Sequence, residues 1–286
     1  MKQQKGKQLE EFMLHFQKGR RGITITYLVL ITIVITILVR QFFTGHYEHC
    51  FTCLLTLFLF FIPSFVNKKL QINLPNTLEV IILLFIFSAE ILGEISAFYL
   101  RVPWWDAMLH TMNGFLMAAI GFSLVDILNR NESVKFHLSP IFVAVVAFCF
   151  SMTIGVLWEF FEYAMDVIIK TDMQKDTILQ TFATVDLNPQ GENSPVLVTG
   201  IQNMILVGEQ LMVDQMPCDS YTLNLGGYLD MGIVDTMMDL FVNFVGAVVF
   251  SFIGYFYIKN RGKDNWVSRL IPSKIRKSQE KTSPRP

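Results

Sequence analysis

Residues 23–39 read ITITYLVLITIVITILV, a run without a charged side chain. An α-helix rises about 1.5 Å per residue, so this run with its flanks is long enough to cross the roughly 30 Å hydrocarbon core of a bilayer. The run is too long for the apolar core of a secretory signal peptide, and no small-residue cleavage site follows it. It therefore predicts a retained transmembrane helix.

The whole chain shares this apolar character. Of its 286 residues, 52% are hydrophobic and 16% are charged, and the mean hydropathy is +0.44. These values exclude an ordinary soluble domain of this size. The apolar residues form continuous blocks and do not alternate with polar ones, which favours helices over a β-barrel. We therefore expect an all-α membrane protein without a nucleic-acid partner.

Six stretches have the length and composition of transmembrane helices. They cover about residues 23–43, 50–66, 78–100, 107–128, 139–169 and 235–258. The chain then divides into a cytoplasmic amphipathic segment (1–21), helices one to five (22–169), a partly ordered extracytoplasmic loop (170–234), helix six (235–258) and a cytoplasmic basic tail (259–286). Within the loop we expect short strands at 196–198 and 204–207 and a turn at 188–191.

Basic residues determine the expected orientation. Nineteen lysines and arginines fall on the side of the two termini, and only Arg40, Arg101, Lys170 and Lys175 fall on the other side. By the positive-inside rule, both termini are expected in the cytoplasm. We interpret the chain as a multi-pass plasma-membrane protein of bacterial character.

Ionisable side chains collect near the outer ends of the predicted spans, in pairs three or four residues apart. This spacing puts the members of a pair on one helical face. A charged group at the bilayer centre costs on the order of 2.5–3.5 kcal/mol, so such groups are either protonated or bound to a cation. The pairs are Glu90 and Glu94, Asp106 and His110, Glu159 and Glu162, and Asp235 and Asp239.

Carboxylates with one imidazole suit a divalent metal ion such as Zn²⁺, Mn²⁺ or Mg²⁺, and the sequence leaves its identity open. Asp106 and Asp235 are explained equally well as acids in the first turn of a helix. Glu90 and Glu94 are explained equally well by hydrogen bonds between helices. In a hydrolytic reaction, His110 or Glu159 would be the catalytic base. The predicted metal ligands are Asp106, His110, Glu159, Glu162, Asp235 and Asp239.

Three blocks of the sequence resemble motifs of the YjdF-like bacterial inner-membrane proteins. They are Arg101-Val102-Pro103-Trp104-Trp105-Asp106 with Leu109-His110 and Asn113-Gly114, Trp158-Glu159-Phe160-Phe161-Glu162 with Asp166, and Asp235-Thr236-Met237-Met238-Asp239 with Asn243 and Gly246. That family has no assigned biochemical function, so the resemblance implies a topology and a residue set but no reaction. A long insertion before the last block distinguishes this chain, as does Asn113 where serine is common.

Several functions remain open, and whether the chain is an enzyme is one of the open points. The leading hypothesis is an outward-facing, metal-dependent site that acts on a membrane lipid or a lipid-linked substrate. The alternatives are a proton- or cation-coupled transporter and a non-catalytic assembly partner whose outer loop binds another protein. We see no internal repeat and few charged groups in the cytoplasmic half, which disfavours the transporter.

Overall fold

The structure is a computed structural model, and it describes residues 21–69, 72–129, 138–170, 172–213, 216–260, 270, 271, 273 and 274. The predicted amphipathic segment, except Arg21, and most of the predicted basic tail lie outside these residues. The chain divides into two compact units, residues 1–155 with 241–286 and residues 156–240. Two helices, α8 (Pro140–Ala164) and α9 (Ile233–Lys259), continue without a break through the sequence positions at which the units change.

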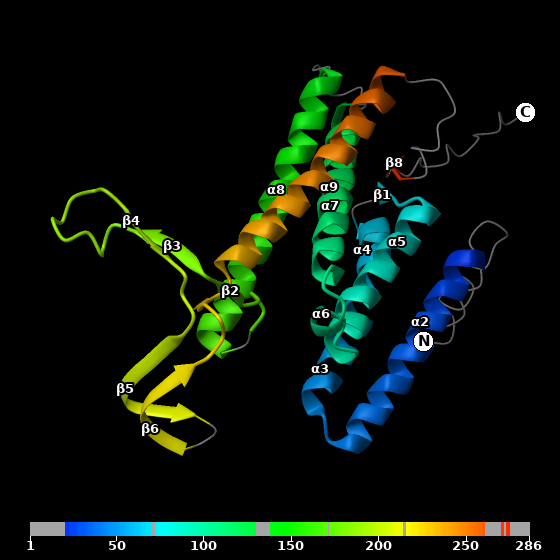
Figure 1. Cartoon of the computed structure of the whole chain (residues 1–286). Helices are drawn as coiled ribbons and strands as arrows, with labels where there is room; N and C mark the ends of the chain where they lie inside the picture. Colours follow the sequence, from blue (N-terminus) through cyan, green and yellow to red (C-terminus); the bar gives the residue numbers. More distant parts are fainter. Residues whose placement is uncertain are drawn as a thin grey trace, which may run out of the picture. The chain divides into compact units, whose positions relative to one another are not determined.

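Five of the described helices are long and apolar enough to cross a membrane (Figure 1). This confirms the expected all-α membrane class, while the number of six spans stays a prediction. The five candidates are α2 (Arg21–Thr44), the stretch Tyr47–Val66 made of α3 (Tyr47–Leu59) with most of α4 (Ile62–Lys69), α7 (Trp105–Asn129), Pro140–Ile168 and α9.

The third predicted span is not one regular helix. Helix α5 (Asn76–Phe87) continues as a π-helix, η1 (Ser88–Ile95), and the short α6 (Phe98–Arg101) follows a turn. Ala97 in this turn has a φ of 55°, which a regular helix excludes. The predicted end near residue 100 is therefore wrong by more than one turn. Since η1 ends at Ile95, Glu94 is an exposed residue at the helix end and does not lie deep in a span.

Apolar clusters hold together the unit made of residues 1–155 and 241–286, which we call the helical unit. One joins α2, α3, α5 and η1 through buried side chains that include Leu30, Val34, Cys53 and Leu83. Another joins α7, α8 and α9, where two large rings pack among alanines. The rings of Phe122 and Phe250 meet edge to face, with centroids 6.0 Å apart. The buried members of this second cluster, which we call the aromatic core, are Ala118, Ala119, Phe122, Val143, Ala147, Ala247, Phe250, Leu270 and Ile271. The unit also has a two-residue ladder of β1 (Ile72–Asn73) and β8 (Ser273–Lys274).

Unit 156–240 contains three antiparallel strand pairs. They are β2 (Thr177–Leu179) with β7 (Tyr228–Asp230), β3 (Thr181–Thr184) with β4 (Val196–Thr199), and β5 (Met204–Val213) with β6 (Met216–Leu223). The strands expected at 196–198 and 204–207 lie in β4 and β5. At the expected turn, the backbone N–H of Gln190 donates to Oδ1 of Asn188, and Gly191 has a φ of 67°.

Candidate metal site

Three helices of the helical unit are joined by hydrogen bonds around Asn243, whose side chain is fully buried. The Nδ2 of Asn113 on α7 donates to Oδ1 of Asn243 on α9 at 3.2 Å. The Nδ2 of Asn243 donates to Sδ of Met152 on α8 at 3.6 Å. The Oγ of Ser151 on α8 donates to the carbonyl oxygen of Gly114 on α7 at 2.7 Å. Because such bonds replace contact with hydrocarbon, they fix how the three helices pack at this level.

Glycines allow the helix backbones to approach each other here. A Cβ atom on Gly114 would overlap the backbone carbonyl of Asn243, and one on Gly246 would overlap the carbonyl of Thr111. A Cβ atom on Gly155 would overlap the side chain of Asn243. Small residues at these contacts are typical of packed membrane helices.

About one helical turn from the level of Asn243, toward the start of α7, the end of α8 and the start of α9, each of the three helices has an ionisable side chain. Because residues three or four apart lie on the same helical face, these side chains emerge on the faces that pack around Asn243. They are His110 on α7, three residues before Asn113; Glu159 on α8, four residues after Gly155; and Asp239 on α9, four residues before Asn243.

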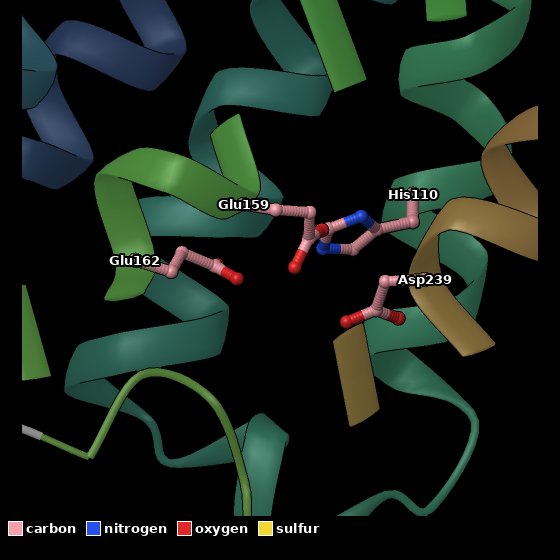
Figure 2. Close-up of side chains that lie close together, drawn as sticks. All are labelled: His110, Glu159, Glu162 and Asp239. Atoms are coloured by element: carbon pink, nitrogen blue, oxygen red, sulfur yellow. The ribbon is translucent and has the colours of Figure 1, made fainter. Parts of the chain in front are cut away.

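Figure 2 shows these three side chains together with Glu162, with the carboxylates turned toward the space beside the imidazole ring. Each of the four offers a ligand atom, and these atoms all lie within 4.8 Å of one another. All four are buried, with exposed fractions of 7% for His110, 4% for Glu159, 7% for Glu162 and 3% for Asp239. We call this group the buried quartet.

A second group consists of Asp106, Asp235 and Asp239, whose ligand atoms satisfy the same distance. Asp106 and Asp235 are only partly buried. The two groups together contain the six residues predicted as metal ligands, and they share Asp239. Glu90 and Glu94 belong to neither group, so among the described residues the acids of the third predicted span do not join this site.

Two contacts orient members of the buried quartet. The Nε2 of His110 lies 3.6 Å from Oδ1 of Asp106, which is four residues earlier on α7. The indole Nε1 of Trp158 donates to Oε1 of Glu162 at 2.8 Å. A carboxylate behind a histidine and a donor behind a carboxylate are typical of the residues that support metal ligands. Neither supporting role was predicted from the sequence, because it depends on the direction of side chains.

Asp235 also has a structural function. Its Oδ2 accepts a hydrogen bond from the backbone N–H of Lys175 at 2.7 Å. The neighbouring Thr236 accepts one from Nε2 of Gln174 at 2.5 Å, and the backbone N–H of Gln174 donates to Asp166 at 2.8 Å. The segment that follows η2 (Met165–Ile169) is thereby bound to the first turn of α9. Asp235 lies in the first turn of α9, where an acid is favourable, and its bond to Lys175 goes to a different segment.

The donor set of the buried quartet fits a divalent cation. Two ligand atoms at about 2.1 Å from one ion lie at most about 4.2 Å apart, so small side-chain rotations suffice to close a set within 4.8 Å. Buried carboxylates are either protonated or held next to positive charge, and a divalent ion would supply that charge. Oxygen ligands with one imidazole exclude the soft metals that prefer thiolates.

Two further buried acids were not predicted from the sequence as candidate functional residues. Glu79 on α5 is 3% exposed and Asp126 on α7 is 2% exposed. The hydroxyl of Tyr27 donates to Oε1 of Glu79 at 3.4 Å. Each acid has only uncharged residues around it in the sequence of an apolar helix, and such a position was the signal that could have identified it.

A family model described as a predicted membrane protein (DUF2238) matches residues 25–260. This agrees with the expected membrane family of unassigned function, while the resemblance to YjdF-like proteins stays a prediction. No curated protein and no solved structure matches the chain.

Proposed function

The chain belongs to the DUF2238 family of predicted membrane proteins, and from this premise we propose that it binds a catalytic divalent metal ion and acts on a lipid or lipid-linked substrate. The observation that supports this proposal most directly is the buried quartet, with four potential ligand atoms within 4.8 Å of one another. Burying these groups costs free energy in a membrane, and a bound ion offsets that cost.

Within this proposal, His110, Glu162 and Asp239 hold the ion and Glu159 is the general base. Catalytic ions commonly have three protein ligands and an open position for water or substrate. The contacts of His110 with Asp106 and of Glu162 with Trp158 orient two of these ligands. A divalent ion bound there would act as a Lewis acid toward water, and Glu159 would be the residue that accepts the proton. This divides the two roles that the sequence assigned jointly to His110 and Glu159.

The depth of the quartet supports a lipid or lipid-linked substrate. His110 is five residues from the start of α7, and Asp239 is six residues from the start of α9. These offsets correspond to about 8–9 Å along each helix. Because the helices are about 37–40 Å long and the hydrocarbon core is about 30 Å thick, the quartet lies close to the boundary between acyl chains and head groups. The basic residues of the sequence assign this end to the extracytoplasmic side.

Elemental analysis of the purified protein tests metal binding. We expect about one divalent ion per chain after purification without chelators, and loss of that ion in His110→Ala and in Asp239→Ala. Ser123→Ala is the matched control, because Ser123 is buried on α7 and its hydroxyl bonds only within the helix, to the carbonyl of Ala119 at 2.6 Å. An equal ion content in all four proteins would remove the proposed centre.

A lipid assay tests the reaction. The purified protein is incubated with a total bacterial lipid extract, with and without a chelator, and the extract is then compared by mass spectrometry. We expect at least one lipid or lipid-linked species to change only when the metal is present, and not with Glu159→Gln. Metal binding without any metal-dependent change would contradict the enzymatic half of the proposal and leave the ion site standing.

A cation pathway is the second candidate, and the buried acids Glu79 and Asp126 favour it. They lie in the half of the helices where the sequence suggested few charged groups. His110 and Asp126 are separated by about 24 Å along α7, and the α7 residues of the aromatic core lie between them. A cation pathway would therefore have to pass this apolar level. Flux of protons or cations through reconstituted vesicles, abolished by Asp126→Asn, would favour this candidate over the enzyme.

A further inference from the structure

An open groove lies between α8 and α9 within the helical unit, toward the Lys259 end of α9. Its lining comes from four residues of α8 between Ile141 and Phe148 and four residues of α9 between Val248 and Tyr255. Its volume is about 320 Å³. Two small lining residues, Ala144 and Ser251, are buried, whereas most of the larger ones are partly exposed. Ala144 and Ser251 therefore form the floor of the groove.

Ser251 is a polar residue in this apolar lining. It is 9% exposed, and its Oγ has no hydrogen-bond partner among the described residues. Serine in a membrane helix ordinarily donates to the carbonyl four residues earlier, as Ser123 does to Ala119 on α7. A buried hydroxyl without such a bond is unfavourable in hydrocarbon, which points to an acceptor that is not among the described residues.

Lys259 lies two helical turns beyond Ser251 on α9, about 12 Å along the helix axis. The Nζ of Lys259 is 5.7 Å from the centroid of the Tyr255 ring, so the ammonium group folds back along α9 toward the groove. Tyr255 is four residues from Ser251, which is about 6 Å along the helix. Ser251 and Tyr255 both line the groove, and the Lys259 ammonium group lies next to the Tyr255 ring. A lipid with its ester carbonyl at Ser251 would therefore have its head group on the Lys259 side.

The size of the groove selects a single chain as its occupant. At about 30 Å³ per group the size of a water molecule, 320 Å³ holds about ten such groups. A transmembrane helix has a diameter of about 10–12 Å and needs several times this space over the same length. The groove therefore has room for one hydrocarbon chain, whereas the backbone of a second helix does not fit inside it.

We propose that this groove binds one acyl chain of an acidic glycerophospholipid, with the ester carbonyl accepting a hydrogen bond from Ser251 and the head group next to Lys259. The lining supplies an apolar wall, Ser251 supplies a donor, and Lys259 supplies the charge that distinguishes an acidic from a zwitterionic lipid. This site uses none of the residues of the buried quartet and does not depend on the proposed metal chemistry.

Retention of lipid tests the proposal. The full chain is reconstituted into vesicles of equal parts phosphatidylglycerol and phosphatidylcholine, extracted into mild detergent, and examined by native mass spectrometry. We expect about one phosphatidylglycerol per chain, and a loss on the order of tenfold in Ala144→Phe, which fills the floor of the groove. Val249→Phe is the matched control, because Val249 lies on α9 outside the lining and is already exposed.

Two milder variants keep the test valid if Ala144→Phe fails to fold. Ser251→Ala and Lys259→Gln leave the packing almost unchanged and should each reduce retention severalfold. Thr153→Ala is their control, because the Thr153 hydroxyl bonds to the carbonyl of Cys149 on an exposed face. Equal retention of phosphatidylcholine, unchanged retention in all three groove variants, or a dimer that Ala144→Phe dissolves would each overturn the proposal.

Discussion

Two levels of the same three helices bury side chains to a similar degree but of opposite character. The aromatic core packs Phe122 and Phe250 among alanines, all fully buried. One turn beyond Asn243, α7, α8 and α9 instead bury His110, Glu159 and Asp239, each less than 8% exposed. Close packing of membrane helices favours the small and aromatic side chains of the aromatic core. Burying the ionisable side chains of the quartet in a membrane costs free energy.

This difference separates residues that stabilise the fold from residues that the fold tolerates. In lipid, apolar side chains gain little from leaving their solvent, so the aromatic core stabilises through close contact. Without a bound ion, the buried quartet does not stabilise the fold in this way. Its ionised carboxylates would repel one another, and burial would remove their hydration. Variants at the two levels should therefore have opposite effects on stability and on ion binding.

The largest expected effect is the loss of the ion from the quartet. Glu159→Gln combined with Asp239→Asn removes two negative charges with little change in volume, so bound metal should disappear completely. The thermal midpoint of the metal-free protein should stay the same or rise, because buried repulsion is relieved. Elemental analysis and a thermal melt in detergent measure both quantities. A lower midpoint in chelator-treated variant than in chelator-treated wild type would show that these acids stabilise the fold by themselves.

The next effect concerns the aromatic core. Phe122→Ala leaves a cavity among Phe250, Tyr257 and the small residues around them. The cost should be on the order of 2 kcal/mol, since the cavity remains although transfer from water does not contribute. This corresponds to a fall in the thermal midpoint on the order of 5 °C. The ion content below that midpoint should be unchanged, and a matching loss of metal would mean that the two levels are not independent.

A smaller effect is expected where a residue only supports a ligand. Trp158→Phe keeps the ring but removes the indole N–H that bonds to Glu162. Metal affinity should fall about tenfold, as is usual for such supporting residues. Competition with a chelator of known affinity measures this change, and Phe160→Leu serves as the control, because Phe160 is also exposed on α8. An unchanged affinity would remove Glu162 from the ligand set.

The smallest effect lies outside the membrane, where an acid repels other acids. Partial burial and the charges of Asp172, Asp230 and Asp166 raise the pKa of Asp176, although Lys175 opposes them. A raised pKa in the folded state means that stability is greatest at low pH and declines as pH rises above the ordinary aspartate value of about 3.9. Hydrogen exchange in Thr177–Leu179, corrected for intrinsic rates, should therefore quicken slightly with pH. Asp176→Asn should abolish this trend, and a trend that persists would assign it to another group.

Local sequence predicted the spans well where one physical requirement dominated. A run such as 23–39 has to be helical in a membrane because its backbone groups find partners only within the segment. The ends of α2, α7 and α9 accordingly fall within two residues of the predictions. The predicted span 139–169 corresponds to α8 with its π-helical continuation η2. The third span failed because its end depends on the turn at Ala97 and on the packing of Tyr99 against Gly93, neither of which is visible as periodicity.

The sequence by itself determined the helical membrane class and the set of acids and histidine near one end of several helices, since hydropathy and three- or four-residue spacing are local properties. Only the tertiary structure decided which of these side chains share a place. Close approach at Gly114 and Gly246 brings α7 and α9 together, and the Asn243 hydrogen bonds fix their level, so that His110 and Asp239 lie one turn beyond it. Glu90 and Glu94 have the same spacing and chemistry but belong to neither group of potential metal ligands among the described residues. Side-chain convergence depends on how helices pack and rotate against each other, and no local pattern encodes that.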